Sequence, residues 1–194
     1  MKLGPVTGRL TGRLWPLALA VAGVAYPLMV YAALPHVPAK ILLVPLLALL
    51  AVRILGTADL GGRGATLALL VAGGVLMALA MVDSDLAVRA YPVAMSLAAA
   101  AAFGVSLGGG PSLIERIARR QTPDLPASGV RYTRRVTMAW CGFLIANAVV
   151  SAGITAFGSL EQWTLWNGLL FYLLAGALLG GEWLVRRAVQ GRAA

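Results

Sequence analysis

Three polar side chains recur at four-residue spacing within an apolar stretch of the C-terminal half: Asn147, Ser151 and Thr155. This spacing places them on one face of a helix. Asn167, in the next apolar stretch, comes level with that face when residues are counted outward from a turn near Leu160. We therefore expect a polar seam between two antiparallel helices. It would serve as interhelical hydrogen bonding or, alternatively, as a polar path or lipid-headgroup slot.

Glu182 is the only acidic residue inside an apolar stretch, and a charge within a membrane segment is a functional candidate. Arg186 follows it at i+4, in the favourable order for a helical ion pair. Counting also puts Glu182 level with Met138, within reach of Arg134 or Arg135. We expect a structural ion pair between Glu182 and Arg186, with a proton-relay or substrate role as the alternative.

Familiar catalytic routes lack their residues in this sequence. His36 is the sole histidine, and Cys141, the sole cysteine, has no histidine near its expected depth. Neither a metal cluster nor a Cys/His pair can be assembled from them. Asp83 and Asp85 flank Ser84 in what reads as an ordinary turn. We therefore predict no catalytic, metal or cofactor site, and no enzyme.

The elements that position these residues are those of a membrane protein. The 194 residues are 60% hydrophobic and 12% charged, whereas soluble chains carry about 25% charged residues. We predict one all-α domain over residues 1–194, a polytopic transmembrane helix bundle. The expected spans are 14–34, 37–55, 65–82, 90–107, 136–157 and 163–184. Only twelve residues separate Lys40 from Arg53 in the second span, so a five-span bundle is the alternative.

The basic residues indicate the orientation of the bundle. Fourteen of the 16 fall at the two ends of the chain and in alternate connections, and the side that retains them is cytoplasmic. The opposite side keeps Lys40 and Arg89, alongside Asp83, Asp85 and Glu161. Both termini are therefore predicted to be cytoplasmic.

The connection after residue 107 predicts a short amphipathic interfacial helix over residues 112–121. Ser112 and Glu115 have the spacing of a capping box. Arginines lie opposite an apolar face formed by Leu113, Ile114, Ile117 and Ala118. The candidate lipid-interface residues are Arg116, Arg119, Arg120, Arg131, Arg134 and Arg135. Because these arginines are juxtamembrane and not interleaved with exposed aromatics, the expected partners are anionic lipid headgroups and not nucleic acid.

Small residues recur at four-residue spacing in two of the predicted spans. They are Ser96, Ala100, Gly104 and Gly108 in one, and Gly176 and Gly180 in the other. In lipid, small residues let helix backbones approach closely. We expect close helix contact there, or self-association or contact with other membrane proteins.

The C-terminal half resembles a known group of proteins. The run from Pro111 to Arg116, then Leu125-Pro126, and then Trp140, Phe143 and Trp163 resemble small inner-membrane proteins of bacterial aryl-polyene (fatty-acid-like) gene clusters. The stretch is more distantly similar to the intracellular septation protein A family. The resemblance implies a multi-pass protein of the bacterial inner (plasma) membrane that supports construction of the cell envelope.

Three functions follow as hypotheses. The first is a non-enzymatic membrane accessory protein for cell-envelope or polyene-lipid biogenesis. The second is a small transporter or lipid-moving protein, which requires the polar seam and Glu182 to line a hydrated cavity. The third is a membrane-embedded enzyme acting on lipid.

Overall fold

The computed structural model describes residues 21, 25–57 and 62–191, and within them every regular element is a helix. Residues 25–33 are helical. The elements that follow are α2 (Ala39–Thr57), α3 (Gly62–Val82), α4 (Ser84–Leu107), α5 (Leu113–Arg119), α6 (Ala127–Phe157), α7 (Leu160–Leu165), the π-helical turn η1 (Trp166–Leu170) and α8 (Phe171–Gly191).

Four helical stretches of the described chain are long and apolar enough to cross a membrane, as in a multi-pass membrane protein. They are Gly64–Val82, Ser84–Leu107, Ala127–Phe157 and Leu160–Leu184. In α2 the apolar stretch found is shorter, Ala39–Ala51. Residues 14–20 and 22–24 of the predicted span 14–34 lie outside the described residues. The count of six spans therefore stays a prediction.

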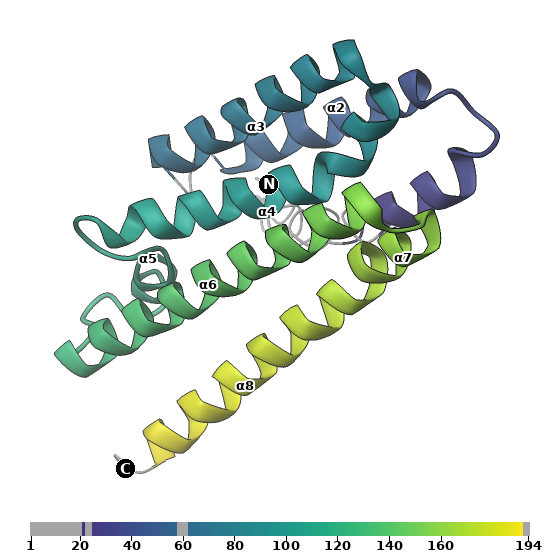
Figure 1. The fold of residues 1–194 in the computed structure, drawn as a ribbon. Coiled ribbons are helices and arrows are strands. Elements are labelled where there is room, and N and C mark those ends of the chain that lie inside the picture. The colour runs from purple at the N-terminus through teal and green to yellow at the C-terminus, as the bar shows by residue number, and fades with distance from the viewer. Residues whose placement is uncertain (1–20, 22–24, 58–61, 192–194) are drawn as a thin grey trace, which may run out of the picture.

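The helices α3, α4 and α6 form the centre of the bundle, since α4 packs along both of the others (Figure 1). Helix α2 lies against α3 and α4. Helix α8 diverges from α6 toward the C-terminus (Figure 1). Figure 1 also shows α5 at one end of α6 and α7 at the other. The bundle thus has two distinct ends, which are joined by α6.

The best-buried core lies near the α7 end of the bundle. Trp163 and Val88 are fully buried there and share one apolar cluster with Leu46 and Tyr26. The Tyr26 hydroxyl donates to the Val88 carbonyl at 3.0 Å, and its ring lies 4.7 Å from that of Tyr91. The helical residues 25–33 are therefore attached to α4 by an apolar contact and a buried hydrogen bond.

Two helices begin earlier than the apolar runs suggest. The predicted turn around Ser84 is confined to Asp83, which alone separates α3 from α4, and Ser84 and Asp85 are already helical. The Asp83 side chain accepts the Leu86 amide at 3.0 Å and caps the helix. Helix α6 begins after Pro126, so the arginines at 131, 134 and 135 lie on a helix. Each helix therefore extends beyond its hydrophobic stretch, α4 with the Asp83 cap and α6 without a side-chain cap.

The connection between α4 and α6 folds back on the end of α4. Gly110 has φ of +76°, a conformation that favours glycine. The Leu113 amide donates to Ser106 Oγ at 3.0 Å, and Arg134 Nη2 donates to the Leu107 carbonyl at 2.9 Å. Helix α5, with seven residues, is shorter than the predicted 112–121. Its position at a membrane surface stays a prediction.

Candidate functional site

The polar seam joins α6 to η1 through a buried hydrogen bond. Ser151 Oγ donates to Asn167 Oδ1 at 2.7 Å, and these residues are 0% and 4% exposed. Asn167 Nδ2 in turn donates to the Trp163 carbonyl at 2.9 Å, one turn earlier. Both polar atoms of the Asn167 amide are therefore bonded to protein groups.

Asn147 belongs to the same buried region but bonds to different partners. Its Nδ2 donates to Ser96 Oγ on α4 at 2.8 Å. Its Oδ1 accepts the indole N–H of Trp166 at 3.0 Å. Asn147 therefore connects α4, α6 and η1. The four-residue spacing of small residues indicates Ser96 only as a packing residue, and no sequence pattern indicates a role for Trp166.

At the α7 end of the seam, the backbone carbonyl of Arg89 accepts two hydrogen bonds. It accepts the Thr155 hydroxyl at 3.3 Å and the indole N–H of Trp163 at 2.9 Å. The Arg89 guanidinium donates from Nη2 to the Gly158 carbonyl at 3.1 Å, while its Nε is buried without a partner in the described chain. A buried tryptophan requires an acceptor for its N–H. For the bond of Trp163 to the Arg89 carbonyl, this requirement is the only indication that the sequence offers.

The π-helical turn positions two of the seam residues, Trp166 and Asn167. A π turn carries an additional residue and so changes the direction of the side chains around it. Gly168, in the same turn, packs against residues 25–33, since a Cβ added there would lie 3.4 Å from Pro27 Cβ. The turn thus faces the seam and the N-terminal helical segment at once.

The seam, as built, is a set of satisfied hydrogen bonds. Its asparagine, serine and threonine side chains are at most 8% exposed, and each of their polar groups named above bonds to another protein group. Within the described part of the chain, no group of three or more His, Cys, Asp or Glu residues could hold a metal ion. The arrangement can fix the positions of α4, α6 and η1 relative to one another.

Glu182 lies on α8 and contacts the first turns of α6. The Tyr132 hydroxyl lies 3.2 Å from Glu182 Oε1 and 3.2 Å from its carbonyl oxygen. Arg134, one of the two expected neighbours, instead bonds to Leu107. The Arg186 side chain lies outside the described side chains, so the pair of Glu182 and Arg186 stays a prediction. Glu182 therefore contacts a residue earlier in α6 than Met138, the position found by counting from the turn.

The six candidate lipid-interface arginines lie on α5, directly after it and on the start of α6, at one end of the bundle. Arg119 pairs with the buried carboxylate of Glu115 at 2.8 Å, and Arg116 Nε donates to the Pro111 carbonyl at 3.0 Å. The Ser112 amide donates to Glu115 Oε2 at 3.4 Å, one arm of the predicted capping box. Arg131 and Arg135 are exposed on α6.

The two small-residue motifs have different surroundings. On α4, Gly104 faces α6, where a Cβ would lie 3.5 Å from Cys141 Sγ. Cys141 Sγ itself lies 3.4 Å from the Ala100 carbonyl, to which it donates. On α8, a Cβ added at Gly176 or Gly180 would meet no atom within 4 Å. Only the motif on α4 is therefore used for helix contact among the described residues.

Comparisons of this chain with protein-family models, curated proteins and solved structures find no match. The function is therefore argued from the geometry of the chain itself.

Proposed function

We propose that the protein is a non-enzymatic integral membrane accessory protein that supports cell-envelope or polyene-lipid biogenesis at the bacterial inner membrane. The observation that carries this proposal is the mutual pairing of the seam residues. A transport path or a catalytic centre needs polar groups that are free to contact a substrate. Here those groups bond to each other, at about 0.6–2 kcal/mol per interhelical bond.

The basic end of the bundle supports a lipid partner on the cytoplasmic side. Arginines near an anionic surface contribute about 1 kcal/mol each, and Arg131 and Arg135 are exposed on the first turns of α6. Ile117 of α5 is 44% exposed and available to acyl chains. In this proposal, both termini and α5 face the cytoplasm, and α5 lies along the membrane surface.

The assignment to envelope or polyene-lipid biogenesis rests on the resemblance of the C-terminal half. Two of the residues that carry it are structural in this chain: Trp163 is fully buried, and Trp140 lies 5.8 Å from Phe143, ring to ring. Neither belongs to a catalytic arrangement. An accessory protein with this organisation would act by holding a partner protein or lipid at the cytoplasmic leaflet.

A small transporter or lipid-moving protein is the second candidate. The observation that favours it is Glu182, a half-buried carboxylate with a tyrosine hydroxyl as its described partner. Intramembrane carboxylates often mark ion or substrate paths. The two candidates differ in whether water reaches the seam.

Cysteine labelling separates them. Cys141 is replaced by serine to remove the native thiol, and Asn147→Cys is introduced. We expect no reaction of this thiol with small water-soluble reagents in membranes. Ser128→Cys, at the exposed start of α6, is the positive control, and Ala146→Cys, on the exposed apolar face beside the seam, is the control for exposure to lipid alone. Rapid labelling at position 147 would overturn the accessory proposal in favour of transport.

Crosslinking tests the partner side of the proposal. The tagged chain is crosslinked in native membranes, and co-purified proteins and lipids are identified by mass spectrometry. We expect enzymes of envelope or polyene-lipid synthesis together with anionic lipid, and the Arg131→Gln/Arg135→Gln variant should retain less of that lipid. Lys40→Gln, a change on the opposite end, is the matched control. Recovery of neither enzymes nor anionic lipid would contradict the proposal.

A further inference from the structure

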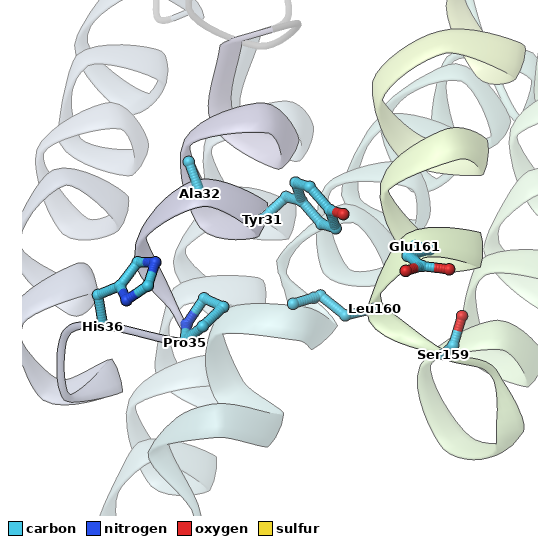
Figure 2. Close-up of a pocket in the computed structure, with 7 residues that line it drawn as sticks. All are labelled: Tyr31, Ala32, Pro35, His36, Ser159, Leu160 and Glu161. Atoms are coloured by element: carbon cyan, nitrogen blue, oxygen red, sulfur yellow. The ribbon is translucent and has the colours of Figure 1, made fainter.

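A hollow of about 530 Å³ lies at the α7 end of the bundle, outside the seam. Two segments far apart in the sequence form it, the turn after residues 25–33 and the turn between α6 and α7 (Figure 2). The lining residues are Tyr31, Ala32, Pro35, His36, Ser159, Leu160 and Glu161. Its volume lies within the range of small-molecule sites.

The polar side chains of the hollow are largely unpaired. Tyr31, His36 and Glu161 are exposed, and none of these three side chains bonds to another described residue. Among the described residues, no basic side chain forms an ion pair with Glu161. Ser159 differs, because its hydroxyl accepts the Gln162 amide at 3.2 Å and caps α7.

The arrangement of these groups favours a positively charged organic ligand. Figure 2 shows Tyr31 with its hydroxyl end directed toward the side of the hollow where the Glu161 carboxylate lies, and Leu160 below the ring. His36 and Pro35 form the opposite side. A carboxylate attracts a cation directly, and the face of an aromatic ring attracts ammonium groups within about 6 Å of its centroid. Leu160 and Pro35 supply apolar contact for attached carbon atoms.

Other ligand classes fit this hollow less well. No metal-binding group of three His, Cys, Asp or Glu residues occurs among the described residues, and an anion would meet the Glu161 carboxylate. This end of the bundle carries Asp83, Asp85 and Glu161 alongside Lys40 and Arg89, in a chain of net charge +9. Asp83 and Asp85 begin α4, whose Arg89 contacts Gly158 in the same turn that contributes Ser159 and Glu161.

We propose that this hollow binds an organic ammonium group, with the Glu161 carboxylate as its counter-ion and the Tyr31 ring as its aromatic wall. The ammonium group could come from the headgroup of an aminophospholipid or from a free amine in solution. In either case the site is at the end of the bundle opposite the arginine-rich α5. The proposal is independent of the accessory function.

Calorimetry with soluble probes tests the free-amine source. The purified full-length protein is titrated with ethanolamine, and with ethylene glycol as the uncharged analogue. We expect ethanolamine to bind more tightly than ethylene glycol, and Glu161→Gln to weaken its binding about tenfold or more. Asp85→Asn, which removes a carboxylate at the same end but outside the hollow, should leave binding unchanged.

Native mass spectrometry tests the lipid source. The protein is mixed with phosphatidylethanolamine and phosphatidylglycerol, and the number of retained molecules is compared between wild type and Glu161→Gln. Selective loss of phosphatidylethanolamine from the variant identifies the headgroup as the ligand. Tyr31→Phe should keep wild-type binding of the retained probe and Tyr31→Ala should lower it several-fold, because only phenylalanine preserves the ring. Binding that does not depend on Glu161 in both assays, or no binding in either, would overturn the proposal.

Discussion

The seam and the hollow are polar regions that the bundle assembles from distant segments, and they differ in whether their polar groups bond to other protein groups. In the seam, Asn147 and Ser151 bond to partners on α4 and η1 and are almost fully buried. In the hollow, Tyr31 and Glu161 are exposed and bond to no other described residue. The polar groups of the seam are thus bonded within the protein, whereas Tyr31 and Glu161 of the hollow are free to bond to a ligand.

The difference follows from the solvent that each region meets. Within hydrocarbon an unpaired polar group costs several kcal/mol, so interior groups must pair with one another. At a water-facing end of the bundle, water satisfies the same groups. A small membrane protein can therefore keep polar side chains available for a ligand most easily at its ends. The seam accordingly supports structure, and the hollow is the better candidate for recognition.

The largest effect on the free energy of unfolding is expected for Asn147→Leu, which tests the structural role of the seam. The substitution leaves Ser96 and the Trp166 indole without their described partner, and one buried unsatisfied group costs about 1–3 kcal/mol. The free energy of unfolding should fall by that amount, as measured by denaturant titration in detergent micelles. Ala146→Leu, at an exposed neighbouring position, should change little. Equal stability of Asn147→Leu and wild type would contradict a structural role for the seam.

A smaller loss is expected for Ser151→Ala. The variant removes the donor to Asn167 Oδ1, and single hydrogen bonds between membrane helices contribute about 0.6–1.7 kcal/mol. The same denaturant titration measures it, with Ser128→Ala at the exposed start of α6 as the control. A loss greater than that of Asn147→Leu would mean that the single bond of Ser151 to Asn167 stabilises the fold more than the two bonds of Asn147 to Ser96 and Trp166.

The sequence predicts the C-terminal ends of several helices better than their N-terminal ends. The predicted C-terminal ends Val82, Leu107 and Phe157 are those observed, because the apolar run and the helix stop together. The starts of α4 and α6 differ by six and nine residues from the expected 90 and 136. The early start of α4 depends on the Asp83 cap, and α6 begins directly after Pro126 without a side-chain cap. Hydrophobicity alone indicates neither start.

The candidate sites show the same limit. Four-residue spacing and counting from a turn bring Ser151 near Asn167, and the two are hydrogen-bonded. The partners of Asn147 depend on the packing of α4 and on the π turn that positions Trp166, neither of which has a periodic signal. The hollow joins Tyr31 to Glu161 across most of the chain, so only the tertiary arrangement brings them together.

The smallest effect on the free energy of unfolding is expected for Glu161→Gln. This variant tests directly whether the hollow, unlike the seam, makes no contribution to stability. Glu161 is exposed and has no ion-pair partner in the described chain, and surface substitutions away from buried contacts usually change stability by less than about 0.5 kcal/mol. The free energy of unfolding should therefore match that of wild type, as measured beside Asp85→Asn. A loss as large as that of Ser151→Ala would show that the carboxylate is a structural group. With stability unchanged, any loss of amine binding in the variant belongs to the contact with the ligand, because the fold that positions Tyr31 and Leu160 is intact.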